Sequence, residues 1–316
     1  MKMFRLTAIS LTLLAGLSLA GQALAAAGDR DDTLRIVVPP WPGVTVKSEM
    51  LSQLIEPLGY TADKQELSST VAYQTLGTNE SDVFLAGWMP SQTTIYDAAM
   101  AKGTIVDLGS NISGARMGFA VPGYVYEAGI TSAEQLADPE VAERFGYTVY
   151  SIESGSNVTD MLNSAIEANT YGLGNWEGMS SSTPGMLSEV DAAARDERWI
   201  VFYGWTPHWM VPEYDSRILD DPESVYGANN GRNDVKTIVS KAYSDANPNM
   251  RQLLDQFTFS ADDQSDFIRE YSLKERKLET VAHDWLVAHP EKVAEFLEGV
   301  TTRDGKPALP AVEASL

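Results

Sequence analysis

The sequence predicts an α/β protein of two lobes with a ligand cleft between them. Short hydrophobic strands alternate with helical stretches along the chain, a pattern typical of a mainly parallel sheet with helices on both faces. A helical stretch, a strand and Gly-Trp-x-Pro occur twice in this order, with the tryptophans at Trp88 and Trp205. This repetition favours two similar lobes, although chance similarity of two short units is an alternative. Tryptophans at strand ends lie where parallel sheets place their ligand sites.

The first 25 residues are typical of a secretory signal peptide. Lys2 and Arg5 precede an apolar run from Leu6 to Leu19, and small residues at Ala23 and Ala25 suit a cleavage site. A membrane anchor is the alternative, but a spanning helix needs about 20 apolar residues. We therefore expect cleavage near Ala25 and a secreted, periplasmic mature protein.

The elements that follow alternate between strand and helix. A hydrophobic strand is stopped by Pro39 and Pro40, and a helical stretch is then ended by Gly59. The predicted elements up to residue 86 are a strand at 34–38, a helix at 46–58, a strand at 61–67, a helix at 71–76 and a strand at 82–86.

Two crossings between the lobes are expected, one near Ser113 and one between Val211 and Asp221. They divide the chain into a first lobe of residues 30–112 and 216–316 and a second lobe of residues 113–215. The tail from Asp234 has helical periodicity, with core-facing positions expected at Val281, Trp285, Leu286, Val293, Phe296 and Leu297.

Composition and missing motifs exclude several classes of protein. The 44 acidic and 23 basic side chains give a net charge of −21, which is the wrong sign for a nucleic-acid binder. The absence of cysteine excludes disulfides, thiolate metal sites and a cysteine nucleophile. His208, His283 and His289 lack the spacing of metal ligands on one helix. Because no catalytic or cofactor motif occurs either, we expect no enzyme, no metal and no cofactor.

Three tryptophans follow hydrophobic strands and precede a turn or a helix start: Trp41, Trp88 and Trp205. Each one alone could be a packing residue, but the shared placement favours a cleft. Indole faces bind cations that cannot donate hydrogen bonds, such as a trimethylammonium group, and each desolvated contact contributes roughly 2 kcal/mol. We interpret Trp176, Trp199, Trp209 and Trp285 as packing residues.

These motifs resemble the periplasmic binding proteins of transporters for glycine betaine, proline betaine and choline. The matching pieces are the turn at Trp41, residues 82–90, residues 152–155 and the longest motif, residues 201–210. The resemblance covers nearly all of the chain after the signal peptide. It implies the type II fold of two α/β lobes that close on a ligand, with Trp41, Trp88 and Trp205 as the aromatic box.

Two departures from the choline-binding branch bear on the ligand. Met117 stands where that branch has a tyrosine, and Gly43 stands where it has an aspartate. A nearby acid would repel the carboxylate of a betaine, so Gly43 favours a zwitterion. Its carboxylate would bind the backbone N–H groups of Gly43 and Val44 at a helix start. The resemblance also implies the ring of His208 as a donor, the alternative being a loop histidine.

Ser156 and Asn157 match a polar loop that contacts the far end of the ligand in the choline-binding relatives, or else they are turn residues. We therefore predict a monomeric solute-binding protein that delivers glycine betaine, or a close betaine, to a membrane ABC permease. Choline or carnitine in the same fold is one alternative. A secreted enzyme acting on a methylated amine is a remote one.

Overall fold

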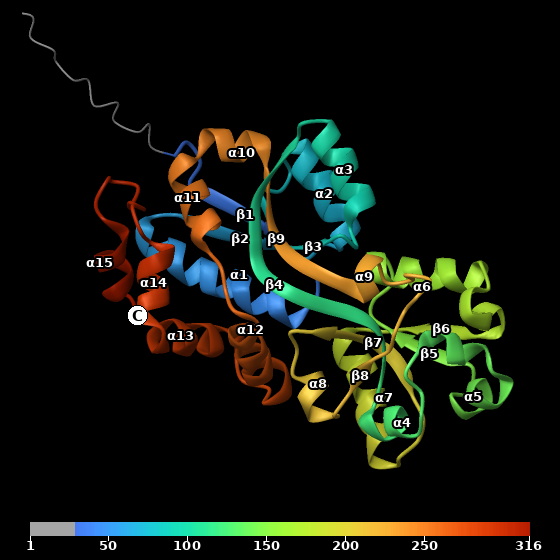
Figure 1. Cartoon of the computed structure of the whole chain (residues 1–316). Coiled ribbons are helices and arrows are strands. Elements are labelled where there is room, and N and C mark those ends of the chain that lie inside the picture. The colour runs from blue at the N-terminus through green and yellow to red at the C-terminus, as the bar shows by residue number, and fades with distance from the viewer. Residues whose placement is uncertain (1–28) are drawn as a thin grey trace, which may run out of the picture.

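The computed structural model describes residues 29–316, so the predicted signal peptide lies outside the described residues. Within this range nine strands form one twisted sheet, in the order β2-β1-β3-β9-β4-β7-β5-β6 with β8 paired to β4. Helices cover both faces of each half (Figure 1). The α/β prediction is confirmed, but the sheet is mixed, because β9 and β4 run antiparallel to their neighbours.

The first half begins with three parallel strands and the helices that connect them. Its elements are β1 (Thr33–Val37), α1 (Pro42–Ile55), η1 (Glu56–Leu58), β2 (Thr61–Gln65), α2 (Ser69–Thr78), β3 (Val83–Met89) and α3 (Thr93–Ala101). All five elements predicted up to residue 86 are therefore present. Gly59 has a φ of 92°, the left-handed conformation expected of a glycine that ends a helix.

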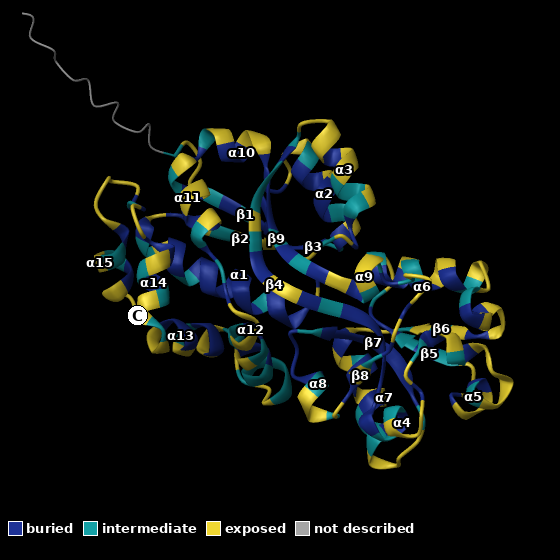
Figure 2. Ribbon diagram, viewed as in Figure 1, coloured by how far each residue is buried: buried dark blue, intermediate teal, exposed yellow. Residues whose placement is uncertain are grey.

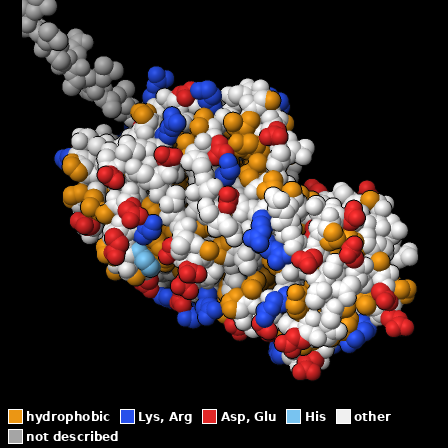
Figure 3. Space-filling view, in the orientation of Figure 1, with side chains coloured by type: hydrophobic (Ala, Val, Ile, Leu, Met, Phe, Trp, Pro, Cys, Tyr) orange, Lys and Arg blue, Asp and Glu red, His pale blue; other side chains and the backbone are white. Residues whose placement is uncertain are grey.

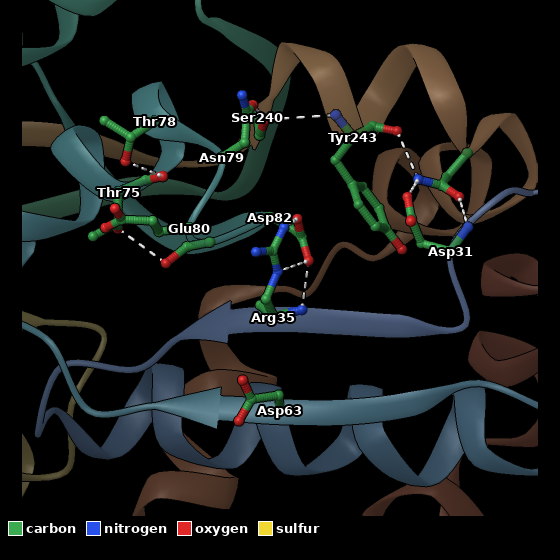
Figure 4. Close-up of polar contacts among 12 residues, drawn as sticks. Asp31, Arg35, Asp63, Thr75, Thr78, Asn79, Glu80, Asp82, Ser240 and Tyr243 are labelled. Atoms are coloured by element: carbon green, nitrogen blue, oxygen red, sulfur yellow. Dashed lines mark hydrogen bonds and ion pairs between the residues drawn. The ribbon is translucent and has the colours of Figure 1, made fainter.

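An ion pair between Arg35 and Asp82 connects β1 to the start of β3. The Arg35 guanidinium on β1 donates to both carboxylate oxygens of Asp82, at 2.9 and 2.6 Å, just before β3 begins (Figure 4). The backbone N–H of Arg35 donates to the same carboxylate at 2.8 Å. Bidentate pairs of this kind combine charge with fixed geometry, so the register of β1 beside β3 is well defined.

Two long antiparallel strands connect the halves. They are β4 (Ile105–Val121) and β9 (Arg232–Ser240), which run side by side from one half into the other (Figure 1). Their pairing shifts register three times, between residues 107 and 115 of β4. Such bulges bend and twist a strand, and here they lie between the two halves.

The second half repeats the parallel arrangement with β5 (Thr148–Ser151), β6 (Glu177–Ser180) and β7 (Val201–Thr206), and β7 pairs with the end of β4. Ser68 caps α2 and Ser182 caps α7, which precede β3 and β7 respectively. The two predicted units thus form the same capped helix and strand. The other elements here are α4 (Gly123–Glu127), η2 (Ala133–Ala137), α5 (Pro139–Arg144), α6 (Asn157–Glu167), η3 (Thr170–Asn175), α7 (Thr183–Arg195), α8 (Met210–Glu213), β8 (Arg217–Ile218) and α9 (Ala228–Gly231).

The segment after α8 packs on the second half. Strand β8 pairs with Ala120 and Val121 of β4, and Tyr226 packs edge-on against Phe119 at 4.8 Å between ring centroids. The chain returns to the first half only along β9.

The carboxyl-terminal helices pack on the first half, as predicted, and α1 contacts α12 and α13. All six core-facing positions expected in the tail are buried. The elements are α10 (Lys241–Ala246), α11 (Pro248–Gln256), α12 (Ala261–Ile268), η4 (Arg269–Leu273), α13 (Leu278–Ala288), α14 (Pro290–Phe296) and α15 (Ala308–Glu313).

The inner strands, such as β3 and β7, are the most buried part of the protein, whereas the edge strands β2 and β6 and the outward faces of the helices are partly exposed (Figure 2). On the face seen in Figure 3, acidic side chains are scattered with basic ones between them rather than gathered into one patch. No helix among residues 29–316 is long and apolar enough to cross a membrane.

Candidate functional site

A cavity lies where the two halves meet, and residues of both halves line it. Seven of the nine predicted site residues are on its wall: Trp41, Gly43, Val44, Trp88, Met117, Asn157 and Trp205. Ser156 and His208 are not. The wall also includes three residues that the sequence did not single out, namely Lys47, Tyr203 and Gln264.

Three tryptophans form what we call the Trp box: Trp41, Trp88 and Trp205. Trp41 precedes α1, Trp88 lies in β3 and Trp205 lies in β7, so two come from the first half and one from the second. They are 9%, 9% and 6% exposed respectively. Buried indole faces around one cavity suit a desolvated cation.

A tyrosine provides a further aromatic ring beside the box. Tyr203 stacks on Trp205 with 5.2 Å between ring centroids and 28° between planes, and its hydroxyl lies 3.0 Å from the sulfur of Met117. Tyr203 and Trp205 are two residues apart on β7 and therefore share a face. The side chain of Met117 therefore lies on the cavity wall beside the aromatic ring of Tyr203, which comes from the neighbouring strand β7.

A half-buried carboxylate in the second half holds one ring of the box in place. Glu153 Oε1 accepts a hydrogen bond from Trp41 Nε1 at 2.8 Å, and Glu153 Oε2 is buried without a partner. Burial raises the pKa of Glu153 above its usual value, against the opposing effect of its hydrogen bonds. This contact joins the halves and brings negative charge close to the box.

His208 lies against the box rather than on the cavity wall. Its ring meets Trp205 edge-on at 4.8 Å between centroids, and it is 2% exposed. Nδ1 accepts from the backbone N–H of Met210 at 3.1 Å, so the proton of the neutral ring is on Nε2, which has no partner. Burial lowers the pKa of His208 to about 3. The ring is therefore an uncharged donor at neutral pH.

The two polar residues at the start of α6 have different surroundings. Ser156 caps the helix: its hydroxyl accepts from Thr159 N and donates to the Glu153 carbonyl. It is thus the turn residue of the alternative interpretation. Asn157 faces the cavity, and its Oδ1 accepts from Ser69 and Gln92 of the first half at 3.3 and 3.4 Å. Its Nδ2 is buried and without a partner.

The amino terminus of α1 faces the cavity through Gly43 and Val44, and no side chain caps it. Gln264 of α12 packs against this turn. A Cβ at Gly43 would lie 3.1 Å from Gln264 Cδ and 3.2 Å from its Nε2, so Gln264 occupies the space that an acid at position 43 would need. Backbone N–H groups at the start of a helix carry partial positive charge, which favours an anion at this end of the cavity.

Among residues 29–316, no three His, Cys, Asp or Glu side chains gather as metal ligands. His289 instead stacks on Trp285 at 4.2 Å between ring centroids. Of the residues missed by sequence reasoning, Tyr203 could have been found from its alternation with Trp205. Lys47 could have been found as a lysine one turn after Gly43 in an apolar stretch. Gln264 could not, because it is distant in sequence.

Comparison with known families gives one match over most of the chain. Residues 32–288 match the family described as "Substrate binding domain of ABC-type glycine betaine transport system". The chain is 36% identical over 177 residues to the glycine betaine/carnitine transport binding protein of Listeria monocytogenes. This alignment spans 56% of the chain and 58% of that relative. The glycine betaine-binding periplasmic protein of Dickeya dadantii is 25% identical over 232 residues, 65% of this chain and 69% of that one.

Solved structures of similar proteins share the fold over nearly their whole length. A choline-binding protein of an ABC transporter, solved with choline, has a TM-score of 0.85 and 29% identity, covering 90% of this chain and 98% of that one. A lactococcal protein in its closed conformation with glycine betaine has a TM-score of 0.74 and 26% identity, covering 84% and 99%. The two-lobed fold expected from the sequence is thus confirmed.

Proposed function

The chain belongs to the family of substrate-binding domains of ABC-type glycine betaine transport systems, and from that premise we propose that it binds glycine betaine or a close betaine. The observation that carries the proposal is the Trp box together with unpaired hydrogen-bond donors on or beside one cavity. The box suits a trimethylammonium group. Three desolvated contacts of roughly 2 kcal/mol each give about 6 kcal/mol, whereas micromolar binding requires about 8 kcal/mol beyond the cost of association, so the hydrogen bonds to the ligand carboxylate must contribute as well.

The carboxylate of the ligand would bind at the turn that begins α1. The backbone N–H groups of Gly43 and Val44 are its proposed donors. The Nε2–H of His208 is a third, supported by its being buried without a partner. Asn157 Nδ2 is a further free donor, contributed by the second half. These donors are neutral, so they can accept a carboxylate without adding a net charge to the site.

The proposed mechanism is closure of two lobes on the ligand. We divide the described chain into residues 29–112 with 232–316 and residues 113–231, joined by β4 and β9. A ligand that contacts both lobes only when they are closed shifts the population toward the closed form. That form would be recognised by the membrane ABC permease, the expected partner of a periplasmic monomer, with no covalent chemistry and no cofactor.

Choline or carnitine is the second candidate, and Glu153 is the observation in its favour. A half-buried carboxylate beside Trp41 would stabilise any quaternary ammonium group, with or without a ligand carboxylate. The choline-bound neighbour has a TM-score of 0.85, against 0.74 for the neighbour bound to glycine betaine. A secreted enzyme acting on a methylated amine is the remote alternative, and recovery of unchanged ligand after long incubation would exclude it.

Calorimetry of the purified mature protein with glycine betaine, choline and carnitine tests the proposal. We expect micromolar or tighter binding of glycine betaine and weaker binding of choline. Tight choline binding with no response to glycine betaine would overturn the assignment of a zwitterion. Trp fluorescence provides an independent readout, because three indoles line the proposed site.

A further inference from the structure

A lysine lies buried on the wall of the same cavity. Lys47 is in α1, one turn after Gly43 and Val44, and is 1% exposed. Its Nζ donates to the Leu85 carbonyl of β3 at 3.1 Å and to Asn111 Oδ1 of β4 at 2.6 Å. An ammonium group has three N–H donors, so these two neutral acceptors leave one donor for another group.

No carboxylate compensates the charge of Lys47 within the described part of the chain. Burial lowers the pKa of Lys47 to about 7, and no charged neighbour contributes to that shift. The carboxylates on the elements packed around α1 are paired elsewhere or exposed. They are Glu49 with Lys64, Asp107 with Lys236, Glu270 with Lys274 and Arg276, Asp284 with Arg276, Asp263 with Ser260, and the exposed Glu56, Asp63, Asp262, Asp266 and Glu279. A buried cation without an anion is costly.

We propose that Lys47 determines the specificity of the pocket for a zwitterion, as the positive charge that a ligand carboxylate compensates. This inference rests on the proposed function and deepens it. A betaine places its carboxylate near the start of α1 and its ammonium in the Trp box, so the buried Lys47 and the half-buried Glu153 beside the box both gain an opposite partner. Choline satisfies Glu153 alone and brings a second positive charge into the cavity of Lys47.

The same geometry couples ligand binding to the uptake or release of protons by Lys47. When the pocket is free, Lys47 is partly deprotonated just above neutral pH. A carboxylate nearby favours the charged form and raises the pKa, so betaine binding at about pH 8 should take up protons. A purely cationic ligand has the opposite effect and should release protons at about pH 7, where a larger fraction of Lys47 is protonated. A lysine that only packs against Asn111 would show neither change.

The test compares Lys47→Met with the wild type. Methionine has a similar length and no charge, and Lys64→Met is the matched control, because Lys64 pairs with Glu49 outside the cavity. We expect Lys47→Met to lower the ratio of betaine affinity to choline affinity by at least about tenfold. Calorimetry of wild-type protein in two buffers of different ionisation enthalpy should detect proton uptake with betaine.

The outcomes separate this inference from the proposed function. An equal loss of affinity for both ligands in Lys47→Met, or wild-type betaine binding without proton uptake, would overturn the role of Lys47 and leave betaine binding intact. A wild type that binds neither ligand would overturn both proposals. If Lys47→Met does not fold, the proton measurement on the wild type alone decides.

Discussion

Introducing an acid at Gly43 should convert the pocket from zwitterion to cation selectivity. In the wall of the cavity, a Cβ at this position would lie 3.1 Å from Gln264 Cδ and 3.3 Å from Ile268 Cδ1. The side chain of Gln264 must therefore move slightly before an aspartate fits. Once there, the new carboxylate faces the region in which we place the carboxylate of a betaine.

The expected size of the effect follows from Coulomb's law. Two like charges about 5 Å apart at an effective dielectric constant near 20 repel each other by about 3 kcal/mol. This corresponds to roughly a hundredfold loss in affinity for glycine betaine. Choline has no carboxylate, so its affinity should rise, by less than that factor because the new acid is also desolvated.

Calorimetric titration of Gly43→Asp and Gly43→Asn with both ligands checks this prediction. Asparagine has the shape of aspartate without its charge, so it isolates the steric cost of displacing Gln264. We expect Gly43→Asn to lower the affinities for glycine betaine and choline by similar factors. Gly43→Asp should instead make choline the more tightly bound ligand. If the two variants lose betaine affinity equally, the reasoning from charge is wrong.

Three further predictions concern single contacts of the site. Glu153→Gln should retain an acceptor for Trp41 and weaken binding less than Glu153→Ala, which loses charge and bond together. We expect the alanine variant to bind every ligand at least about tenfold more weakly in calorimetry. Trp88→Ala should lower the affinity for quaternary ammonium ligands about 30-fold, because a contact of about 2 kcal/mol is lost. Trp199 lies outside the cavity, so Trp199→Ala should leave the affinity unchanged. The pKa of His208 is lowered in the folded state, so stability should fall from about pH 6.5 toward about pH 3 as the unfolded chain gains the proton first. Urea titrations at pH 7 and pH 4 measure the free energy of unfolding of the wild type and of His208→Asn. An equal loss of this free energy between the two pH values in both proteins would contradict the assignment to His208.

The position of the Trp box could be predicted from sequence because it depends on local order. A hydrophobic strand followed by Gly-Trp-x-Pro brings the indole to the edge of a sheet, wherever the rest of the chain goes. Trp88 and Trp205 reach one cavity for this reason. The alternation of side chains along β7 also places Tyr203 on the same face as Trp205.

The remaining features depend on contacts between segments far apart in the chain. Gln264 reaches Gly43 only because α12 packs on α1. The residues of these two helices do not indicate that they lie side by side. The pairing of β8 with β4 is likewise not indicated by the sequence, because a strand of two residues is too short to show a periodic pattern. The surroundings of His208 are also not indicated by the sequence, because its Nδ1 accepts from Met210 and its ring packs edge-on against Trp205.

The ribbon of β4 and β9 has a consequence for how affinity can evolve. Its strands stay hydrogen bonded on both sides of the three register shifts, so the halves can swing by bending at the bulges without unpairing the sheet. The energy of opening then resides mainly in side-chain contacts across the cleft, such as Trp209 Nε1 to Ser272 at 2.6 Å. Substitutions at such remote contacts would change the fraction of closed molecules, and hence the apparent affinity, while every ligand contact stays the same. Uptake could therefore be retuned to a new external concentration without altering which solute is chosen.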